Sequence, residues 1–187
     1  MTKQKLPEKL VVIGNGMAGC RAIEEILKKD AGAFEITVFG AEPRVNYNRI
    51  MLSPVLAGEK AFEDIIINDE AWYADNGVTL YSGVPVTRID RAAKVVYAGN
   101  VSVSYDRLVL ATGSDPFIIP VPGSKLPGVV TFRDLDDVDK MLAAAEKGGS
   151  AVVIGGGLLG LEAAHGLDLR GMGITGEYSI MRHMMNL

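Results

Sequence analysis

The spacing of apolar and polar residues along the chain predicts several helices and strands. From Met17 to Lys29, apolar side chains recur every three or four residues and charged side chains take the opposite face, which is typical of a helix on a protein surface. A similar period predicts a helix over about 135–147, closed by two glycines, and another that ends near Arg170. Short runs of β-branched and aromatic residues predict strands at 10–13, 34–39 and 152–154.

The middle of the chain carries shorter signals. Ser53 and Pro54 predict the start of a short helix, with Ser53 as its N-cap, that ends at Gly58. From 78 to 103 the alternation of apolar and polar residues comes in short pieces separated by turn residues, which predicts a small antiparallel meander. The other expected elements are a loop over a site at 41–53, a helix from about Asp69 to Asn76, and strands at 107–111 and 129–130.

A stretch rich in proline divides the chain. Residues 114–128 contain Pro116, Pro120, Pro122 and Pro127, a density that neither a helix nor a central strand tolerates. We therefore predict one domain over 1–118 and the beginning of another over 119–187. A length of 187 residues suits one domain and part of a second.

One glycine pattern occurs twice, once in each predicted domain. Each copy follows a β-branched run, leads into a helical period and reads Gly-x-Gly-x-x-Gly, with its glycines at Gly14, Gly16 and Gly19 and at Gly155, Gly157 and Gly160. In such a turn the first glycine permits a tight bend, the second lets a pyrophosphate approach the backbone, and the third lets helix and strand pack closely. The free N–H groups at the start of the helix favour the phosphate charge. A single copy can be merely a turn, but two copies predict an α/β fold with two Rossmann-like dinucleotide-binding domains, the first with the meander inserted and the second incomplete.

Two further residues are candidates for contacts with a dinucleotide. An acidic residue at the carboxyl end of the second strand normally accepts hydrogen bonds from a ribose hydroxyl. Glu42 lies just past that strand whereas Glu35 lies at its start, so we favour Glu42, the alternative being a solvated loop carboxylate. Arg49 either pairs with a pyrophosphate through its planar guanidinium or lies at the surface as an ordinary arginine.

Composition narrows the class of partner. A hydrophobic content of 48% supports a real core, and the net charge of −4 gives no general attraction to nucleic acid or anionic lipid. No apolar stretch approaches the roughly 20 residues that span a bilayer. The apolar run after the N-terminal lysines is too short for a signal peptide, so we expect a cytoplasmic protein whose partners are small molecules or other proteins.

Several residues of types that often carry chemistry are better interpreted as structural. Cys20, the single cysteine, falls on the apolar face of the first predicted helix, which favours core filling and excludes a disulfide or a cysteine-ligated cluster held by this chain alone. His165 and His183 have no partners at metal-ligand spacing, so we predict no metal site. Trp72 and Tyr73 are expected to be a packing pair.

The motifs together resemble a known family. The matching segments are the Gly-Asn-Gly-Met-Ala-Gly turn, Val38–Pro43, Asn46–Gly58, Trp72–Gly77, Leu110–Ser114 and Val153–Ala164. They resemble the N-terminal region of the large subunit of assimilatory NAD(P)H-dependent nitrite reductase, over about Lys9 to Met172. The broader superfamily that this implies is the FAD-dependent pyridine-nucleotide oxidoreductases, whose first glycine fingerprint holds FAD and whose second holds NAD(P)H.

The resemblance implies two sets of cofactor-binding residues. Those toward FAD are Gly14, Gly16, Met17, Ala18 and Gly19 at its pyrophosphate, Glu42 at its ribose, Arg49 beside its phosphates, Val86 at its adenine, and Ala111, Thr112 and Gly113 close to the cofactor. Those toward NAD(P)H are Gly155, Gly157, Leu158, Leu159 and Gly160 at its pyrophosphate and Glu162 near the nicotinamide. The alternative for Glu162 is an ordinary glutamate near a helix N-terminus, where the dipole favours it.

The implied reaction is hydride transfer from nicotinamide to flavin, followed by electron transfer to an acceptor. No Cys-x-x-Cys or Cys-x-x-x-x-Cys pair is present, which excludes a disulfide relay, so electrons must leave directly or through another module. The leading hypothesis is the FAD/NAD(P)H oxidoreductase portion of a nitrite-reductase-like enzyme. The alternatives are a rubredoxin- or ferredoxin-reductase-like electron donor, and a non-catalytic nucleotide-binding remnant or a fragment that needs a complementing chain.

The family pattern breaks after Met172. Gly176 and Glu177 interrupt the β-branched strand expected there, and the methionine-rich end has no convincing period. We therefore expect a truncated or frame-shifted second domain, without the region that reduces nitrite in the family. Four apolar helix residues should then be short of partners, namely Leu158, Leu159, Leu161 and Leu167.

Overall fold

The computed structural model describes residues 6–177. Within them the chain forms two compact units. The first unit comprises the described residues up to Tyr47 together with Ile66–Ser114, and the second comprises Asn48–Ile65 together with the described residues from Asp115 onward. The segment 48–65 therefore leaves the first unit and the chain later returns to it. The domain boundary after residue 118 stays a prediction, since a compact unit need not coincide with a domain.

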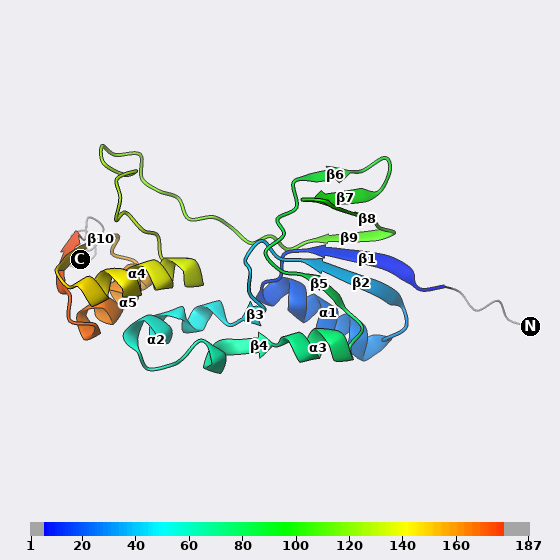
Figure 1. Cartoon of the computed structure of the whole chain (residues 1–187), viewed down its shortest axis with the longest axis horizontal. Coiled ribbons are helices and arrows are strands. Elements are labelled where there is room, and N and C mark those ends of the chain that lie inside the picture. The colour runs from blue at the N-terminus through cyan, green and yellow to red at the C-terminus, as the bar shows by residue number, and fades with distance from the viewer. Residues whose placement is uncertain (1–5, 178–187) are drawn as a thin grey trace, which may run out of the picture. The chain divides into compact units, whose positions relative to one another are not determined.

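The first unit is built on a parallel sheet (Figure 1). Its strands, in spatial order, are β5 (Thr79–Tyr81), β2 (Phe34–Phe39), β1 (Glu8–Ile13) and β9 (Arg107–Leu110). The antiparallel meander contains β6 (Arg88–Asp90), β7 (Val95–Ala98) and β8 (Val101–Ser104). The remaining elements are α1 (Met17–Lys29), α3 (Glu70–Asp75) and a short antiparallel pair, β3 (Asn46–Tyr47) with β4 (Ile66–Asn68).

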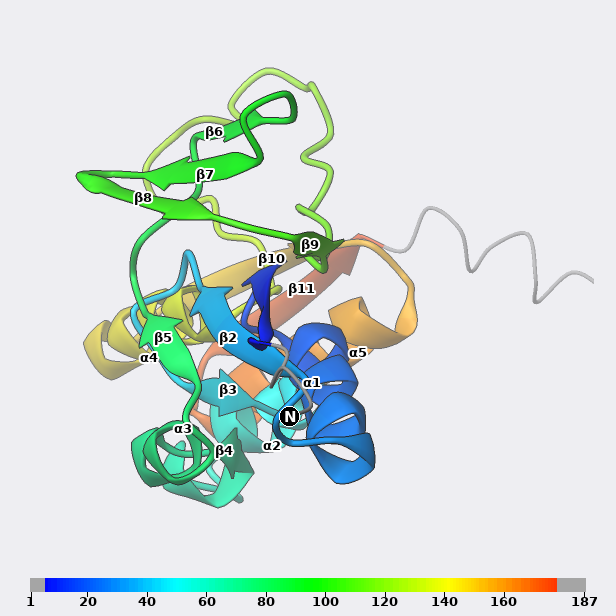
Figure 2. The same cartoon turned by 90° about the vertical axis from the view of Figure 1, so that its right-hand side faces the viewer.

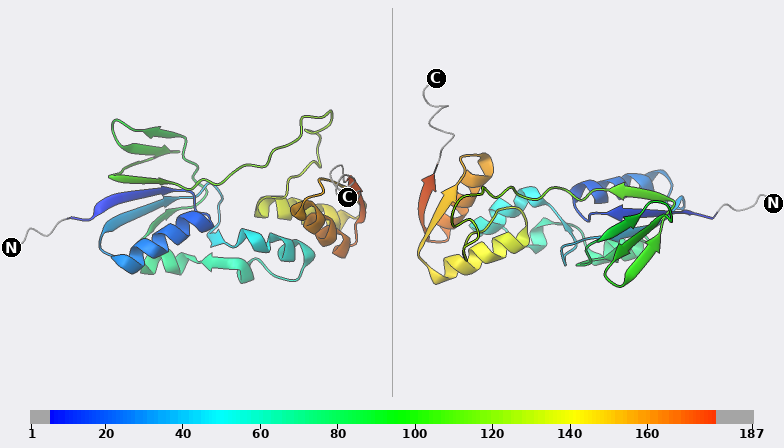
Figure 3. Two further views of the ribbon diagram at one scale, coloured as in Figure 1. Left: turned by 180° about the vertical axis from the view of Figure 1, so that it is seen from behind. Right: turned by 90° about the horizontal axis from the view of Figure 1, so that it is seen from above.

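The parallel sheet of the first unit is covered on both faces (Figures 2 and 3). Successive side chains of a strand point to opposite faces, so Leu10 and Val12 enter one apolar cluster with α1, while Val11 and Ile13 enter another with the meander. All four side chains are buried. Burial on both faces explains why β1 reads as a continuous apolar run rather than an alternating one.

The second unit combines helices with a two-stranded parallel sheet. Its elements are α2 (Leu52–Ala57), α4 (Leu135–Lys147), β10 (Ser150–Ile154), α5 (Leu158–Leu169), β11 (Gly173–Glu177) and the 3₁₀ turns Arg49–Met51 and Glu63–Ile65. Helix α2 packs closely on α5, since a Cβ atom on Gly166 would lie 2.8 Å from Leu56 Cγ. Arg170 reinforces this contact, because its guanidinium donates to the carbonyl oxygens of Leu56 at 2.7 Å and Val55 at 3.1 Å.

The predicted elements with a clear period are confirmed, including α1, β2, α4 and the helix that ends near Arg170. The short helix begins at Leu52, and Ser53 is not its cap. A 3₁₀ turn runs directly into this helix, and its own cap is Asn48, whose side chain accepts from the Ile50 N–H at 3.1 Å. The Ser53 hydroxyl is therefore available for a contact elsewhere.

Three strand predictions were wrong. Residues 79–81 lie at the edge of the parallel sheet instead of in the meander, because they follow α3 and pair with β2. No strand forms at 129–130, directly after Gly128 with its positive φ of 90°. The strand β11 does form across Gly176, since its backbone pairs in register with β10 from Ser150↔Gly173 to Ile154↔Glu177.

The prediction about uncovered leucines holds for three of four. Leu158, Leu159 and Leu161 are exposed, at 72%, 55% and 37%, whereas Leu167 is buried at 5%. Leu167 lies on the same side of α5 as Ala163 and Gly166, which are also buried. The methionine-rich end and His183 lie outside the described residues.

Candidate nucleotide-binding sites

The two glycine turns share one backbone geometry. Gly14, between β1 and α1, has a φ of +115°, and Gly155, between β10 and α5, has a φ of +132°. Residues with a Cβ atom are strained in this region, which explains glycine at both positions. A Cβ atom on Gly19 would lie 2.4 Å from the Gly14 carbonyl oxygen, and one on Gly160 would lie 2.1 Å from the Gly155 oxygen. The third glycine of each turn therefore allows the helix to start directly against the strand end.

The second glycine of each turn faces open space. A Cβ atom on Gly16 or Gly157 would meet nothing within 4 Å. Both glycines are N-caps with extended backbone, and neither supplies a side-chain hydrogen bond to its helix. The first turns of α1 and α5 also carry no acidic residue. Uncapped N–H groups beside open space fit a pyrophosphate at both turns, where Met17 and Ala18 or Leu158 and Leu159 supply the backbone.

Residues after β9 lie against the first turn. The Ala111 N–H donates to the Ile13 carbonyl at 2.8 Å, and a Cβ atom on Gly14 would lie 2.1 Å from the Ala111 oxygen. Thr112 and Gly113 follow directly, the latter with a φ of +75°. The structure thus brings Ala111, Thr112 and Gly113 beside the turn, as a cofactor-facing segment at the carboxyl end of a parallel sheet requires.

Glu42 is held in place just past the carboxyl end of β2. Its carboxylate accepts a hydrogen bond from the Tyr47 hydroxyl at 2.6 Å, and its backbone oxygen accepts from the Gly83 N–H at 2.9 Å. Glu35, the other candidate, is exposed at the opposite end of the same strand. An anchored carboxylate at the sheet's carboxyl edge suits a ribose acceptor better than a freely solvated loop residue does. Val86 is half-buried against the meander cluster of the same unit.

Arg49 and Glu162, two predicted site residues outside the glycine turns, lie in the second unit. The Arg49 guanidinium donates to the Arg133 carbonyl oxygen at 3.1 Å. The Ser53 hydroxyl donates to the Glu162 carboxylate at 2.5 Å, which ties the start of α2 to α5. Arg49 therefore lies in the same unit as the second glycine turn, whereas the first glycine turn lies in the first unit. Sequence reasoning missed the Ser53–Glu162 contact because it assigned Ser53 to a cap.

The structural interpretations of Cys20 and of the aromatic pair are confirmed. Cys20 is fully buried, and burial raises the pKa of its thiol. Trp72 and Tyr73 pack edge to face with ring centroids 5.0 Å apart. Burial likewise raises the pKa of the Tyr73 hydroxyl.

A metal centre needs clustered ligands, and a membrane span needs a long apolar helix. Within residues 6–177, no group of three or more His, Cys, Asp or Glu side chains is arranged to hold a metal ion. None of the helices in the same range has the length and apolar character needed to cross a membrane.

Comparison with known protein families identifies the family of this chain. Residues 8–184 match the family described as pyridine nucleotide-disulphide oxidoreductase, which is nearly the whole chain. The chain belongs to this family. Pyridine nucleotide-disulphide oxidoreductases bind FAD and NAD(P)H, so the pyrophosphate geometry of both turns agrees with the family's cofactors. The α/β fold with a parallel sheet is likewise that of the family's solved structures.

Relatives within the family include enzymes of nitrogen metabolism. The chain is 52% identical over 169 residues to the nitrite reductase [NAD(P)H] of Bacillus subtilis, and 48% identical over 169 residues to the assimilatory nitrate reductase electron transfer subunit of the same organism. Each match covers 90% of this chain but only 21% or 22% of the relative. The chain thus spans about a fifth of the length of these relatives.

Among solved structures, the NADH:rubredoxin oxidoreductase of Clostridium acetobutylicum superposes with a TM-score of 0.81 at 29% identity, over 91% of this chain and 44% of that protein. The NAD-dependent persulfide reductase of A. fulgidus superposes with a TM-score of 0.82 at 32% identity, over 90% of this chain and 33% of that protein.

Proposed function

We propose that this chain is the FAD- and NAD(P)H-binding portion of an electron-transferring oxidoreductase of the nitrite reductase type. The observation that carries the proposal is the repetition of one turn geometry, with a positive-φ first glycine, an open second glycine and a closely packed third glycine. Two such turns suit two dinucleotides, and transfer of a hydride from NAD(P)H to FAD needs a site for each.

Each turn has a distinct role in the proposal. The first turn binds the FAD pyrophosphate, with Glu42 at the ribose and Ala111–Gly113 along the cofactor. The second turn binds the NAD(P)H pyrophosphate, and Glu162 orients the nicotinamide end with its carboxylate held by Ser53. FAD, when bound, would accept a hydride from NAD(P)H and pass the electrons on to an acceptor.

The electrons leave without a cysteine relay in this proposal. Cys20 is the only cysteine, and it is buried and hydrogen bonded. A disulfide relay needs two thiols that can reach each other, so in this proposal electrons leave the flavin directly or through another module. The relatives named for nitrite reductase and for nitrate reductase electron transfer support an acceptor in nitrogen assimilation.

A second candidate is an electron donor to a small redox protein. The similarity to the NADH:rubredoxin oxidoreductase, and 36% identity over 168 residues to the rhodocoxin reductase of Rhodococcus erythropolis, favour it. The two candidates share both nucleotide sites and differ only in the acceptor. Added rubredoxin or ferredoxin is reduced at the expense of NADH under the second candidate and stays oxidised under the first.

The visible absorbance spectrum of the purified chain, incubated with FAD and then freed of excess, tests the proposal. We expect a bound-flavin band that bleaches on anaerobic addition of NADH. The matched control is Gly157→Ala, which should keep the flavin band and need a higher NADH concentration for the same bleaching, because it fills only the space at the second turn. A chain that stays colourless would overturn the proposal and leave a non-catalytic fragment as the better interpretation.

A further inference from the structure

The residue between the first two glycines of the first turn makes contacts that its counterpart in the second turn cannot make. At this position the first turn has Asn15 and the second has Gly156. The Asn15 amide nitrogen donates to the Arg44 carbonyl oxygen at 3.3 Å, and its oxygen accepts from the Tyr73 hydroxyl at 2.6 Å. Since the second turn reaches the same backbone geometry without a side chain here, the turn itself does not require these bonds.

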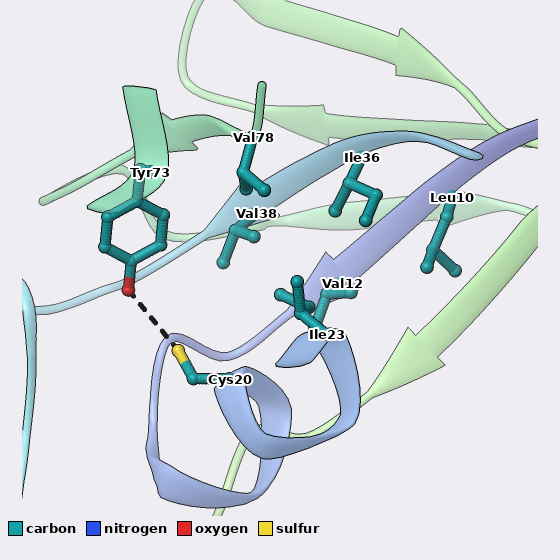
Figure 4. Close-up of a cluster of buried hydrophobic side chains, with 8 residues drawn as sticks. All are labelled: Leu10, Val12, Cys20, Ile23, Ile36, Val38, Tyr73 and Val78. Atoms are coloured by element: carbon teal, nitrogen blue, oxygen red, sulfur yellow. Dashed lines mark hydrogen bonds between the residues drawn. The ribbon is translucent and has the colours of Figure 1, made fainter. Parts of the chain in front are cut away.

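The partners of Asn15 come from elements far apart in the sequence. Tyr73 lies on α3, 58 residues later, and its ring is buried in the α1-side cluster (Figure 4). Cys20, on α1, lies 3.3 Å from both the Tyr73 hydroxyl and the Asn15 side-chain oxygen. A buried polar group is costly unless it is hydrogen bonded, and here each group satisfies the others.

The other end of the Asn15 amide reaches the segment that carries Glu42. Arg44 lies two residues beyond Glu42, and Tyr47, three residues further on, holds the Glu42 carboxylate at 2.6 Å. Gly40 leaves room for this approach, because a Cβ atom there would lie 2.9 Å from the Asn15 Cβ. One amide thus joins the pyrophosphate turn, the segment with the ribose carboxylate, and α3.

We propose that Asn15 and Tyr73 are positioning residues for the dinucleotide bound at the first turn. They hold the turn and the 40–47 segment at a constant separation, so the pyrophosphate and the ribose of one ligand meet both at once. The inference rests on the proposed function, since it needs a dinucleotide at this turn. The second turn, with Gly156, has no equivalent side chain to anchor.

The affinity for FAD in two variants tests the inference. Tyr73→Phe keeps the ring and removes only the hydroxyl, and Asn15→Gly reproduces the residue of the second turn. Because a net hydrogen bond is modest, we expect the dissociation constant of FAD to rise about fivefold in Tyr73→Phe and more in Asn15→Gly. Tyr105→Phe, whose residue packs in the meander cluster instead, is the matched control and should bind FAD normally.

Two readouts separate positioning from a general loss of structure. Cys20 is the single thiol, so the rate at which a chromogenic aromatic disulfide labels it reports local opening at α1 and α3 in the absence of any cofactor. This labelling rate should rise in Tyr73→Phe and stay unchanged in Tyr105→Phe. The effect of Tyr73→Phe on FAD affinity should also shrink when Glu42→Gln is already present, because positioning residues and the residue they position are coupled.

Each outcome is decisive. Coupled effects of Tyr73→Phe and Glu42→Gln on FAD affinity support the inference. Faster Cys20 labelling with unchanged FAD affinity, or strictly additive effects on affinity, overturns it and leaves Tyr73 a packing residue. Failure of the unaltered chain to bind FAD overturns the proposed function and the inference together, which distinguishes that result from the failure of the inference alone.

Discussion

Replacing single glycines of the first turn by alanine should separate stability from cofactor binding. In Gly19→Ala, the added methyl would lie 2.4 Å from the Gly14 carbonyl oxygen and 3.3 Å from the Ala111 Cβ. Alanine gains about 1 kcal/mol over glycine inside a helix. Forcing an atom into a packed site typically costs about 1–3 kcal/mol and occasionally more. Because the obstructing atom is backbone and cannot rotate away, we expect a cost at the upper end of this range, about 3 kcal/mol, and hence a net loss of about 2 kcal/mol.

Gly16→Ala should show the opposite signature. A Cβ atom at Gly16 meets nothing within 4 Å, and its φ of −90° suits alanine. Alanine is a poorer N-cap than glycine, but it also reduces the freedom of the unfolded chain, and the two effects of about 0.5–1 kcal/mol oppose each other. The free energy of unfolding should therefore change by less than about 0.5 kcal/mol. The methyl stands where a pyrophosphate would approach, so FAD affinity should fall about tenfold or more, equivalent to about 1.4 kcal/mol.

Urea unfolding followed by circular dichroism gives the stability of each variant, and flavin fluorescence titration gives the affinity. The second turn supplies an internal replicate, with Gly160→Ala expected to behave like Gly19→Ala and Gly157→Ala expected to weaken NADH rather than FAD. A Gly19→Ala protein as stable as the unaltered chain would refute the packing argument. A Gly16→Ala protein that binds FAD normally would refute the placement of the pyrophosphate.

Three further outcomes follow from the contacts. Arg170→Ala should lower the free energy of unfolding in urea by about 1–2 kcal/mol, because the carbonyl oxygens of Val55 and Leu56 lose a charged donor. An unchanged urea midpoint would mean that packing alone holds α2. Asp137→Ala should lower the free energy of unfolding by about 2 kcal/mol in the same assay, because this buried carboxylate accepts a hydrogen bond from the Thr131 hydroxyl at 2.7 Å. Thr131→Val should reproduce part of this loss, and an unchanged urea midpoint in Thr131→Val would show that this hydrogen bond contributes nothing. Burial raises the pKa of the Cys20 thiol and of the Tyr73 hydroxyl, so the folded chain keeps these protons to higher pH than the unfolded chain does. Their contribution to stability is therefore present below about pH 9 and declines as the pH rises further, and Cys20→Ala should make the urea midpoint less dependent on pH above about pH 9. An equal slope in Cys20→Ala and in the unaltered chain would show that other groups govern this dependence.

The elements that sequence reasoning predicts well are those whose signal is local. The helical period of apolar residues predicts α1, and the Gly-x-Gly-x-x-Gly motif predicts the positive-φ glycines Gly14 and Gly155. The edge strand 79–81 and the strand β11 depend instead on a partner strand elsewhere in the chain. Pairing of this kind offsets the weak strand propensity of a residue such as Gly176, which a local pattern cannot reveal.

The candidate sites divide in the same way. The six fingerprint glycines and Glu42 could be placed from spacing, because each has a role relative to one strand end. The contacts of Asn15 with Tyr73 and of Ser53 with Glu162 join residues 58 and 109 positions apart, so no local pattern predicts them. The roles of all these residues in cofactor binding stay predictions that the variants above test.

The association of α2 with α5 sets an order of events during synthesis. The carbonyl of Leu56 is bound by an arginine that follows it by 114 residues, and the Leu56 side chain is fully buried in the finished unit. At roughly 5–20 residues per second, a ribosome needs between about 6 and 23 seconds to add those residues. During that interval an apolar helix has emerged before the surface that will cover it. The nascent chain therefore offers a chaperone a binding segment that the folded protein no longer presents.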